Sequence, residues 1–225
     1  MKTGKLIAIE GIDGSGKGTQ TELLVNALQA SSLPAEVFRF PQYETSFFGN
    51  EVGKYLHGDY GQLADVPPKF SALLYALDRF EARSMIVSAL EQGKIVLCDR
   101  YTPSNMAHQS ARTSADEQLN MAEWIRYVEQ EVLCLPKPDL VLFLESTVKS
   151  SQTLVGLKEK RTYTDKSHDL QEASTDHLQL ALDQFKKLAA RENWKKVQCI
   201  DPDGHVRAPA DIHRELLVHV LAALR

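Results

Sequence analysis

The chain has 225 residues, with 26 Lys and Arg against 30 Asp and Glu, so its formal net charge is −4. Hydrophobic residues make up 43% of the chain and charged residues 25%, which is ordinary for a soluble globular protein. These figures exclude a disordered tail, a collagen-like repeat and a disulfide-rich secreted scaffold. The acidic balance argues against a protein that binds DNA or RNA as a polymer, but it leaves room for a pocket that holds one small anion.

The beginning of the chain and its cysteines favour a cytoplasmic protein without a membrane partner. The apolar run Leu6–Ile9 is too short for a signal peptide, and no stretch approaches the roughly 18 apolar residues of a membrane helix. Cys98, Cys134 and Cys199 form no CxxC pair, and we expect them to be buried, reduced thiols.

Short apolar runs alternate with longer segments of helical character along the chain. Continuous apolar runs are typical of strands that are covered on both faces. The expected strands are Lys5–Glu10, Glu36–Phe40, Ile95–Cys98, Leu140–Leu144 and Val197–Ile200. The expected helices are Lys17–Ala30, Pro67–Glu91, Asp116–Leu133, Asp169–Arg191 and Ala210–Leu224. This alternation predicts an α/β fold with a parallel sheet, in a single domain over residues 1–225.

The strongest motif is the glycine-rich segment GIDGSGKGT, which joins the first expected strand to the first expected helix. Gly11 and Gly16 allow successive N–H groups to point at one anion, and the helix that follows adds the positive end of its dipole. The segment is similar to the P-loop GxxxxGK[ST], and Lys17 is placed to reach the β and γ phosphates of a nucleotide. A glycine turn without a ligand is the weaker alternative. The residues expected to bind ATP are Gly11, Asp13, Gly14, Ser15, Gly16, Lys17, Gly18 and Thr19.

A second polar group, Asp99 and Arg100, follows the third expected strand. In a doubly wound sheet, ligands bind beyond the carboxyl ends of the strands, so these residues are expected to face the same crevice as the P-loop. Arg100 offers a planar fork for phosphate oxygens, and Asp99 could orient it or hold a metal-bound water. A strand-end ion pair is the alternative.

Aromatic and polar residues elsewhere have the character of a binding site for a nucleotide base. Tyr75 and Arg79 are four residues apart and share one helix face, so a ring and a guanidinium can stack on a base and bind its edge. Further residues expected at the mouth of this binding site are Phe40, Pro41, Tyr43, Ser104, Asn105, His108 and Arg112. The alternatives for all of these residues are core packing, a proline turn and a solvated helix face.

Taken together, these segments resemble the thymidylate kinase family of nucleoside-monophosphate kinases. The segments that carry the resemblance are Gly11–Thr19, Arg39–Pro41, Leu74–Arg79, Asp99–Tyr101, Ser104–Asn105, Leu135–Asp139 and Asp169–Glu172. The resemblance implies a three-layer P-loop kinase fold with strand order 2-3-1-4-5, a short lid near residues 157–168 and a homodimer. It also implies transfer of the γ-phosphoryl group of ATP to dTMP with Mg²⁺, giving dTDP. The alternatives are a P-loop kinase for adenylate, UMP/CMP or deoxynucleosides, and a non-catalytic P-loop protein.

The resemblance also assigns roles to single residues of the dTMP site. Tyr75 matches the ring that stacks on thymine, while Arg79 and Asn105 match the residues at the two edges of the base. Glu172 matches the carboxylate that ends the lid, and Arg112 matches an arginine that follows the helix after Asp99–Tyr101.

Around the phosphates, Asp99 and Arg100 match the pair that handles the monophosphate and the transferring group. Asp13 matches an acid near the sugar 3′-hydroxyl and the metal. The candidate metal ligands are Thr19, Asp13 and Asp99, partly through water.

The sequence departs from the family pattern at three positions that matter for the chemistry. Gly18 stands where Ser or Thr usually follows the P-loop lysine, and His108 stands where some members have a tyrosine against the sugar 2′ position. Gly14 stands where some members carry a catalytic arginine, so we expect the missing charge to come from the lid. Arg161 is preferred there over Lys158, Lys160 and Lys166 because its charge is permanent. The expected catalytic residues are Lys17, Asp99, Arg100 and Arg161.

Overall fold

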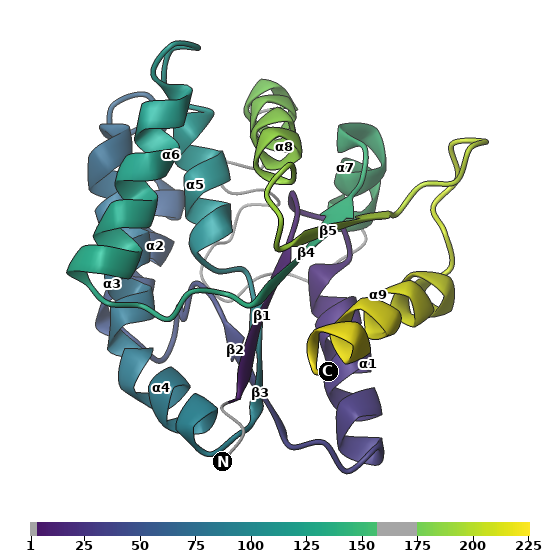
Figure 1. Ribbon diagram of the computed structural model, residues 1–225. Helices are drawn as coiled ribbons and strands as arrows, with labels where there is room; N and C mark the ends of the chain where they lie inside the picture. The colour runs from purple at the N-terminus through teal and green to yellow at the C-terminus, as the bar shows by residue number, and fades with distance from the viewer. Residues whose placement is uncertain (1–3, 157–174) are drawn as a thin grey trace.

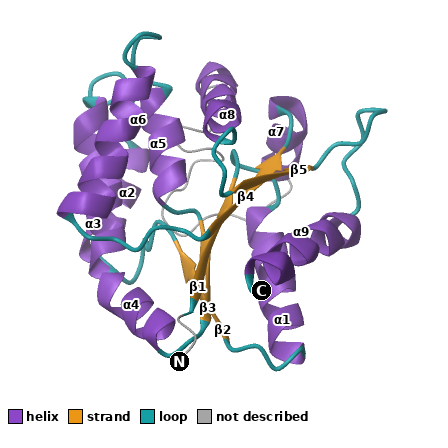
Figure 2. Ribbon diagram, in the orientation of Figure 1, coloured by secondary structure: helices purple, strands orange, loops and turns teal. Residues whose placement is uncertain are grey.

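The computed structural model describes residues 4–156 and 175–225, and these residues build one five-stranded parallel sheet (Figures 1 and 2). The strands are β1 (Lys5–Glu10), β2 (Ala35–Arg39), β3 (Ile95–Asp99), β4 (Leu140–Glu145) and β5 (Trp194–Gln198). Their order, β2-β3-β1-β4-β5, confirms the order that the resemblance implied. The last strand begins three residues earlier than expected, at Trp194, and ends at Gln198.

Helices cover both faces of the sheet (Figure 1). Apolar residues of α1 and α9 pack on one face, and those of α3 to α6 and α8 pack on the other. The helices are α1 (Lys17–Ala30), α2 (Phe47–His57), α3 (Pro68–Glu81), α4 (Arg83–Glu91), α5 (Thr102–Ser110), α6 (Gln118–Tyr127), the π-helix η1 (Val128–Val132), α7 (Val148–Gly156), α8 (Thr175–Leu188) and α9 (Pro209–Ala223).

Several helices differ from the prediction. The single helix expected over 67–91 is interrupted at Ala82, which separates α3 from α4. The helix expected over 116–133 widens into a π turn at η1, where the buried side chain of Glu129 finds its partners. The helices α2 and α7 were not predicted. A local signal existed for α2, because Ser46 caps it by accepting a hydrogen bond from Gly49 N at 2.8 Å.

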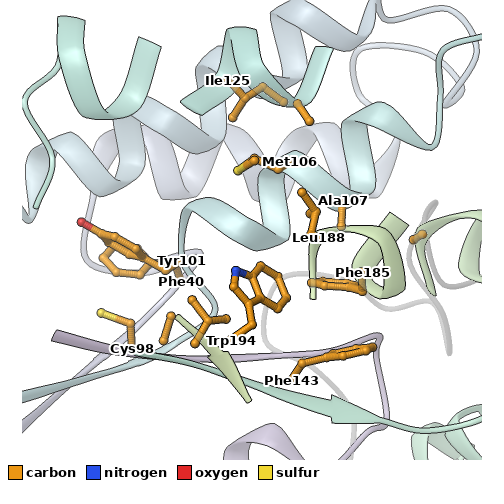
Figure 3. Packing of buried hydrophobic residues seen from close by; sticks show 14 of the residues in the cluster. Phe40, Cys98, Tyr101, Met106, Ala107, Ile125, Phe143, Phe185, Leu188 and Trp194 are labelled. Carbon is orange, nitrogen blue, oxygen red and sulfur yellow. The ribbon is translucent and has the colours of Figure 1, made fainter. Parts of the chain in front are cut away.

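Successive residues of the central strands point to opposite faces of the sheet, as the pleat requires. Ala8 lies in the cluster with α3 to α6 and α8, whereas its neighbour Ile9 lies in the cluster with α1 and α9. Figure 3 shows part of the first cluster. The rings of Phe143 and Phe185 stack there with centroids 5.5 Å apart, and Trp194 meets Phe143 edge-on. The core therefore fixes α8 against the sheet through aromatic contacts.

Three expectations about the whole chain have different outcomes. The cysteines are free as expected, but only Cys98 and Cys199 are buried, so the prediction of a buried thiol is wrong for Cys134. Within the described ranges, no helix has the length and apolar character needed to cross a membrane. The single domain over residues 1–225 stays a prediction, because 157–174 lie outside those ranges.

The pairing of β1, β2 and β3 brings their carboxyl ends to the same level. Asp99 pairs with Ile9 on one side and with Arg39 on the other. The ladder continues one residue further, because Arg100 N donates to Ile9 O at 3.1 Å and Phe40 N donates to Asp99 O at 3.1 Å. The segments that follow the three strands therefore leave the same edge of the sheet.

Candidate active site

The segment after β1 forms a tight loop around the first turn of α1. Gly11, Gly14 and Gly16 have φ angles of 148°, 78° and 92°, a region that residues with a side chain rarely adopt. The Lys17 ammonium donates to the carbonyl oxygens of Gly11 at 3.0 Å and Ile12 at 2.8 Å. The predicted ATP-binding segment thus has the loop-and-helix arrangement that binds anions, with its lysine lying across the loop.

Gly14 leaves no room for a side chain because it lies against the backbone of α7. A Cβ atom at this position would be 2.1 Å from the carbonyl oxygen of Ser151. At Gly16, by contrast, a Cβ atom would meet no described heavy atom within 4 Å. The arginine that some family members carry at the position of Gly14 therefore does not fit here unless α7 moves.

The first turn of α1 approaches the carboxylate at the end of β3. A Cβ atom at Gly18 would lie 3.5 Å from Oδ2 of Asp99, an ordinary van der Waals distance. Thr19, the next residue, is exposed. Asp13, Asp99 and Thr19 offer the hard oxygen atoms that Mg²⁺ prefers. Among residues 4–156 and 175–225, however, no three His, Cys, Asp or Glu side chains gather into a cluster that could hold a metal alone.

Arg100 connects the P-loop to α5. Its guanidinium forms an ion pair with Asp13, and its Nη1 donates to Ser104 Oγ at 3.1 Å and to Gly11 O at 3.4 Å. Its φ angle of 67° is in the left-handed region, which is unusual for a residue with a long side chain. Such backbone strain is typical of functional sites that the surrounding structure holds in place.

The buried carboxylate of Glu10 holds the beginning of α5. Its Oε1 accepts a hydrogen bond from Tyr101 N at 2.8 Å, and its Oε2 accepts one from Ser104 Oγ at 2.5 Å. Burial raises the pKa of Glu10 to about 7, and the bond from Ser104 and the charge of Arg100 lower it only in part. Glu10 was not singled out from the sequence, although it directly precedes the P-loop.

Most of the residues predicted to bind dTMP lie together around one pocket. Two lining residues were not predicted: Leu56, which α2 supplies, and Gln109, which lies four residues after Asn105 on α5. The full lining is Asp13, Phe40, Pro41, Tyr43, Leu56, Tyr75, Arg79, Arg100, Ser104, Asn105, His108 and Gln109. The structure thus brings the predicted residues together, while their binding roles stay predictions.

Arg79, one of the lining residues, belongs to a fully buried ion pair. Arg79 is 1% exposed, and its guanidinium binds both carboxylate oxygens of Glu129. The same carboxylate accepts a hydrogen bond from Asn105 Nδ2 at 2.8 Å. The ring of Tyr75 meets that of Tyr55 edge-on, with centroids 6.4 Å apart. No local pattern in the sequence distinguishes Glu129 from an ordinary residue of a helix.

His108 connects the pocket to α8. Its Nδ1 lies 3.4 Å from Nε2 of His177, and its ring meets Phe185 edge-on. Burial lowers the pKa of both histidines, that of His177 to about 4, so both rings are neutral near pH 7. Nε2 of His108 is buried and finds no hydrogen-bond partner among the described residues.

Arg112 does not belong to the pocket lining. Its guanidinium donates to the side chains of Tyr55, Ser71 and Gln109 and to the carbonyl oxygens of Leu63 and Val66. It therefore ties the segment before α3 to α2 and α5, and its contact with dTMP stays a prediction.

The expected lid lies outside the described residues. It includes Arg161, Lys158, Lys160 and Lys166, and Glu172 follows it within the same undescribed range, so the structure does not place these residues.

The fold and the site define the class of the protein. A glycine-rich phosphate loop between β1 and α1, in a parallel sheet of order 2-3-1-4-5, with Arg100 beside it, is the arrangement of a P-loop kinase. The chain belongs to the thymidylate kinase family, since the sequence model of that family, described as thymidylate kinase, matches residues 9–200.

Relatives from distant organisms agree with this assignment. The chain is 37% identical to a thymidylate kinase of Mycobacterium tuberculosis over 139 residues, 62% of this chain and 64% of that one. It is 38% identical to the human thymidylate kinase over 144 residues, 64% of this chain and 62% of that one. These two matches thus span somewhat less than two thirds of the relatives. The match to a probable thymidylate kinase of Pyrococcus abyssi is longer, with 31% identity over 203 residues, 89% of this chain and 93% of that one.

A solved structure shows the same fold. A thymidylate kinase from Candida albicans matches with a TM-score of 0.74 and 22% identity, over 99% of this chain and 94% of that one.

Gly14 and Gly16 offer a matched pair of substitutions. Both Gly14→Ala and Gly16→Ala place a side chain at a positive φ angle, but only the first drives a Cβ atom into α7. We expect Gly14→Ala to lower the free energy of unfolding by about 2 kcal/mol more than Gly16→Ala. Urea denaturation of the two variants measures this difference. Equal losses would show that α7 yields without resistance.

The raised pKa of Glu10 makes the free energy of unfolding depend on pH. Because its pKa is raised in the folded protein, the folded state keeps the proton between pH 4.5 and about 7. This preference of the folded state for protonated Glu10 contributes its full stabilisation below pH 4.5, and the contribution is lost as the pH rises through about 7. We compare the unfolding free energy of the wild type with that of Glu10→Gln, which does not titrate at this position. The difference, wild type minus variant, should fall by about 3 kcal/mol between pH 4.5 and about 7. Urea denaturation of both proteins at the two ends of the range tests this, and a constant difference would contradict it.

Proposed function

We propose that the protein transfers the γ-phosphoryl group of ATP to dTMP, giving ADP and dTDP. One observation carries the proposal: Arg100 lines the pocket of the predicted dTMP residues and is bonded at the same time to Asp13 and Gly11 of the P-loop. A guanidinium between the two places can bind donor and acceptor phosphates together. Membership of the thymidylate kinase family supports the choice of substrate.

The P-loop binds the donor in this proposal. Its backbone N–H groups and the N-terminus of α1 surround the β and γ phosphates of ATP. Lys17 exchanges its bonds to Gly11 and Ile12 for bonds to phosphate oxygens. Phosphoryl transfer demands alignment and neutralisation of charge more than covalent help from the protein, and Lys17 and Arg100 supply both.

The pocket binds the acceptor. The monophosphate lies at Arg100, and the base stacks on Tyr75 with its polar edge toward Arg79 and Asn105. The sugar lies near Asp13, Ser104 and His108, while Phe40, Pro41 and Tyr43 complete the mouth. The neutral ring of His108 presents no charge to the sugar.

Mg²⁺ fits the available oxygen atoms. Asp99, Asp13 and Thr19 would hold it, directly or through water, together with phosphate oxygens of ATP. When bound, the ion neutralises charge on the donor phosphates. Gly18 has no hydroxyl group to offer, and Asp13 already pairs with Arg100, so the protein contributes few direct ligands.

The remaining parts of the proposal depend on the resemblance. Arg161 supplies the charge that Gly14 lacks, Glu172 ends the lid, and Arg112 contacts dTMP or supports the pocket through Gln109. A cytoplasmic location is in keeping with the free cysteines.

Arg100→Ala tests the proposed chemistry. We expect kcat with ATP and dTMP to fall about 100-fold or more, because the charge beside both phosphates is removed. Thermal unfolding should stay close to that of the wild type. The matched control is Arg126→Ala, which removes an arginine paired with Glu123 outside the pocket and should leave kcat unchanged. Equal loss of folding and activity in Arg100→Ala would make Arg100 structural.

A panel of acceptors separates the rival functions. The purified chain is incubated with ATP and dTMP, dUMP, AMP, UMP, CMP or deoxynucleosides, and the products are separated chromatographically. We expect dTDP to form fastest. A preference for AMP would identify an adenylate kinase, and hydrolysis of ATP without transfer would identify a non-catalytic P-loop protein.

We also propose that the protein forms a homodimer through α3. Phe70, Leu73, Leu77 and Phe80 repeat at helical spacing on one face of α3. Phe70 is 66% exposed and Phe80 45% exposed. This apolar helix face is exposed to water in the single chain, and it can be buried by packing against the same face of a second copy.

A double substitution tests the dimer. We expect the wild type to elute from size exclusion, with light scattering, at twice the mass of the chain. Phe70→Glu with Leu73→Glu should elute as a monomer, because charge opposes burial of this face. The control Leu180→Glu alters an exposed residue of α8 and should stay dimeric. A monomeric wild type would contradict the proposal.

A further inference from the structure

Glu129 is a buried carboxylate that organises two pocket residues at once. It is fully buried in η1, and four hydrogen bonds saturate its oxygens. Oε2 accepts from Arg79 Nε at 2.8 Å and from Thr102 Oγ1 at 2.6 Å. Oε1 accepts from Arg79 Nη2 at 2.5 Å and from Asn105 Nδ2 at 2.8 Å. Since an ionised carboxylate only accepts, each partner must present a donor to it.

This requirement fixes which way the amide of Asn105 points. The two hydrogens of Nδ2 go to Glu129 Oε1 and, at 3.0 Å, to Ala72 O. Turning the amide over would place its oxygen against two acceptors. Oδ1 therefore faces away from Glu129. Asn105 is only 3% exposed, and Oδ1 has no hydrogen-bond partner among the described residues. Because Asn105 is one of the lining residues, the lining includes a buried acceptor to which no described residue donates.

The same carboxylate also determines which hydrogen-bond donors of Arg79 remain for a ligand. Nε and one hydrogen of Nη2 are directed at Glu129, and Arg79 is one of the residues that line the pocket. The hydrogens that remain can only donate, because arginine has no acceptor. Through Glu129, the pocket lining therefore combines an obligate donor from Arg79 with an obligate acceptor from Asn105.

A donor from Arg79 together with an acceptor from Asn105 matches one kind of pyrimidine. Thymine and uracil carry an acceptor, O4, beside a donor, N3–H. Cytosine carries the reverse, an amino donor at C4 beside the acceptor N3. We propose that Glu129 is a positioning residue that makes the pocket select a 4-carbonyl pyrimidine over a 4-amino pyrimidine. This inference rests on the proposed function, which places the base at Tyr75, and deepens it by naming the source of selectivity.

A merely structural Glu129 would behave differently. If its only role were to neutralise the buried charge of Arg79, its loss would weaken folding and all pyrimidine substrates alike. A positioning role changes the ratio between substrates, because the wrong base leaves buried polar groups unpaired. The ratio of kcat/KM for dTMP to that for dCMP separates the two roles.

The central variant is Glu129→Gln, which keeps the shape but replaces one acceptor by a donor. Either Arg79 or Asn105 then loses its fixed orientation. We expect the dTMP-to-dCMP ratio to fall about tenfold or more, while the KM for ATP changes by less than about two-fold. The matched control is Thr102→Val, which removes a donor to the same carboxylate without altering the described pocket lining. Its ratio should equal that of the wild type.

The outcomes separate this inference from the proposed function. A folded Glu129→Gln variant with the wild-type ratio overturns the inference, and so does an equal fall of the ratio in Thr102→Val. A wild type that does not phosphorylate dTMP overturns the proposed function itself.

If Glu129→Gln does not fold, binding to the wild type tests the assignment of Arg79 as donor and Asn105 as acceptor, from which the role of Glu129 is inferred. Competition against dTMP is measured with dCMP, dUMP and N3-methyl-dTMP. We expect dCMP and N3-methyl-dTMP to bind about 100-fold more weakly than dTMP, and dUMP to bind within about tenfold of it. Binding of dCMP or N3-methyl-dTMP as tight as that of dTMP overturns the inference.

Discussion

The carboxylate of Glu10 is the contact on which the geometry of the site depends. It ends β1, the P-loop begins at the next residue, and its two oxygens hold Tyr101 and Ser104 at the beginning of α5. Arg100 lies between these elements with a strained backbone. The proposed reaction requires two negatively charged phosphates to be aligned within a fraction of an ångström. A buried carboxylate with hydrogen bonds of 2.8 and 2.5 Å fixes the loop and the arginine relative to each other more firmly than surface contacts would.

The positive charges of the site differ in how firmly the protein compensates them. Arg79 is paired with a carboxylate that is as buried as itself, so removing either partner would leave an uncompensated charge in the core. Lys17 rests on loop carbonyls, and Arg100 pairs with Asp13 where both side chains are partly exposed. The fully compensated charge of Arg79 is suited to contact with a neutral base. Lys17 and Arg100 are suited to exchange their present partners for phosphate oxygens. This distribution explains how a chain of net charge −4 can concentrate cations in one place.

The features that could be predicted from the sequence depend on local pattern. The glycine spacing revealed the P-loop, continuous apolar runs revealed the strands, and polar residues after a strand end placed Arg100 beside the P-loop. Because parallel strands end at one edge, residues as distant as Asp13 and Arg100 could be placed together without coordinates. The strand order and the individual roles came from the family resemblance.

The features that the sequence did not reveal depend on tertiary pairing. Glu129 lies 50 residues from Arg79 in the chain, and in a helical pattern it cannot be told from a solvent-exposed glutamate. His177 lies 69 residues from His108 and reaches it only because α8 packs on α5. Arg112 was expected at the mouth of the pocket with Asn105 and His108, but α5 stops at Ser110. The side chain of Arg112 therefore turns toward the segment before α3.

The contact between Gly14 and α7 limits how this sequence can diverge. An arginine at that position would enter the space of the Ser151 carbonyl, so a loop that supplies its own catalytic cation is not one mutation away. A change in α7 that makes room for the side chain has to come first. A helix that contributes no catalytic group in the proposed mechanism thus determines the order in which mutations at the active site can be accepted.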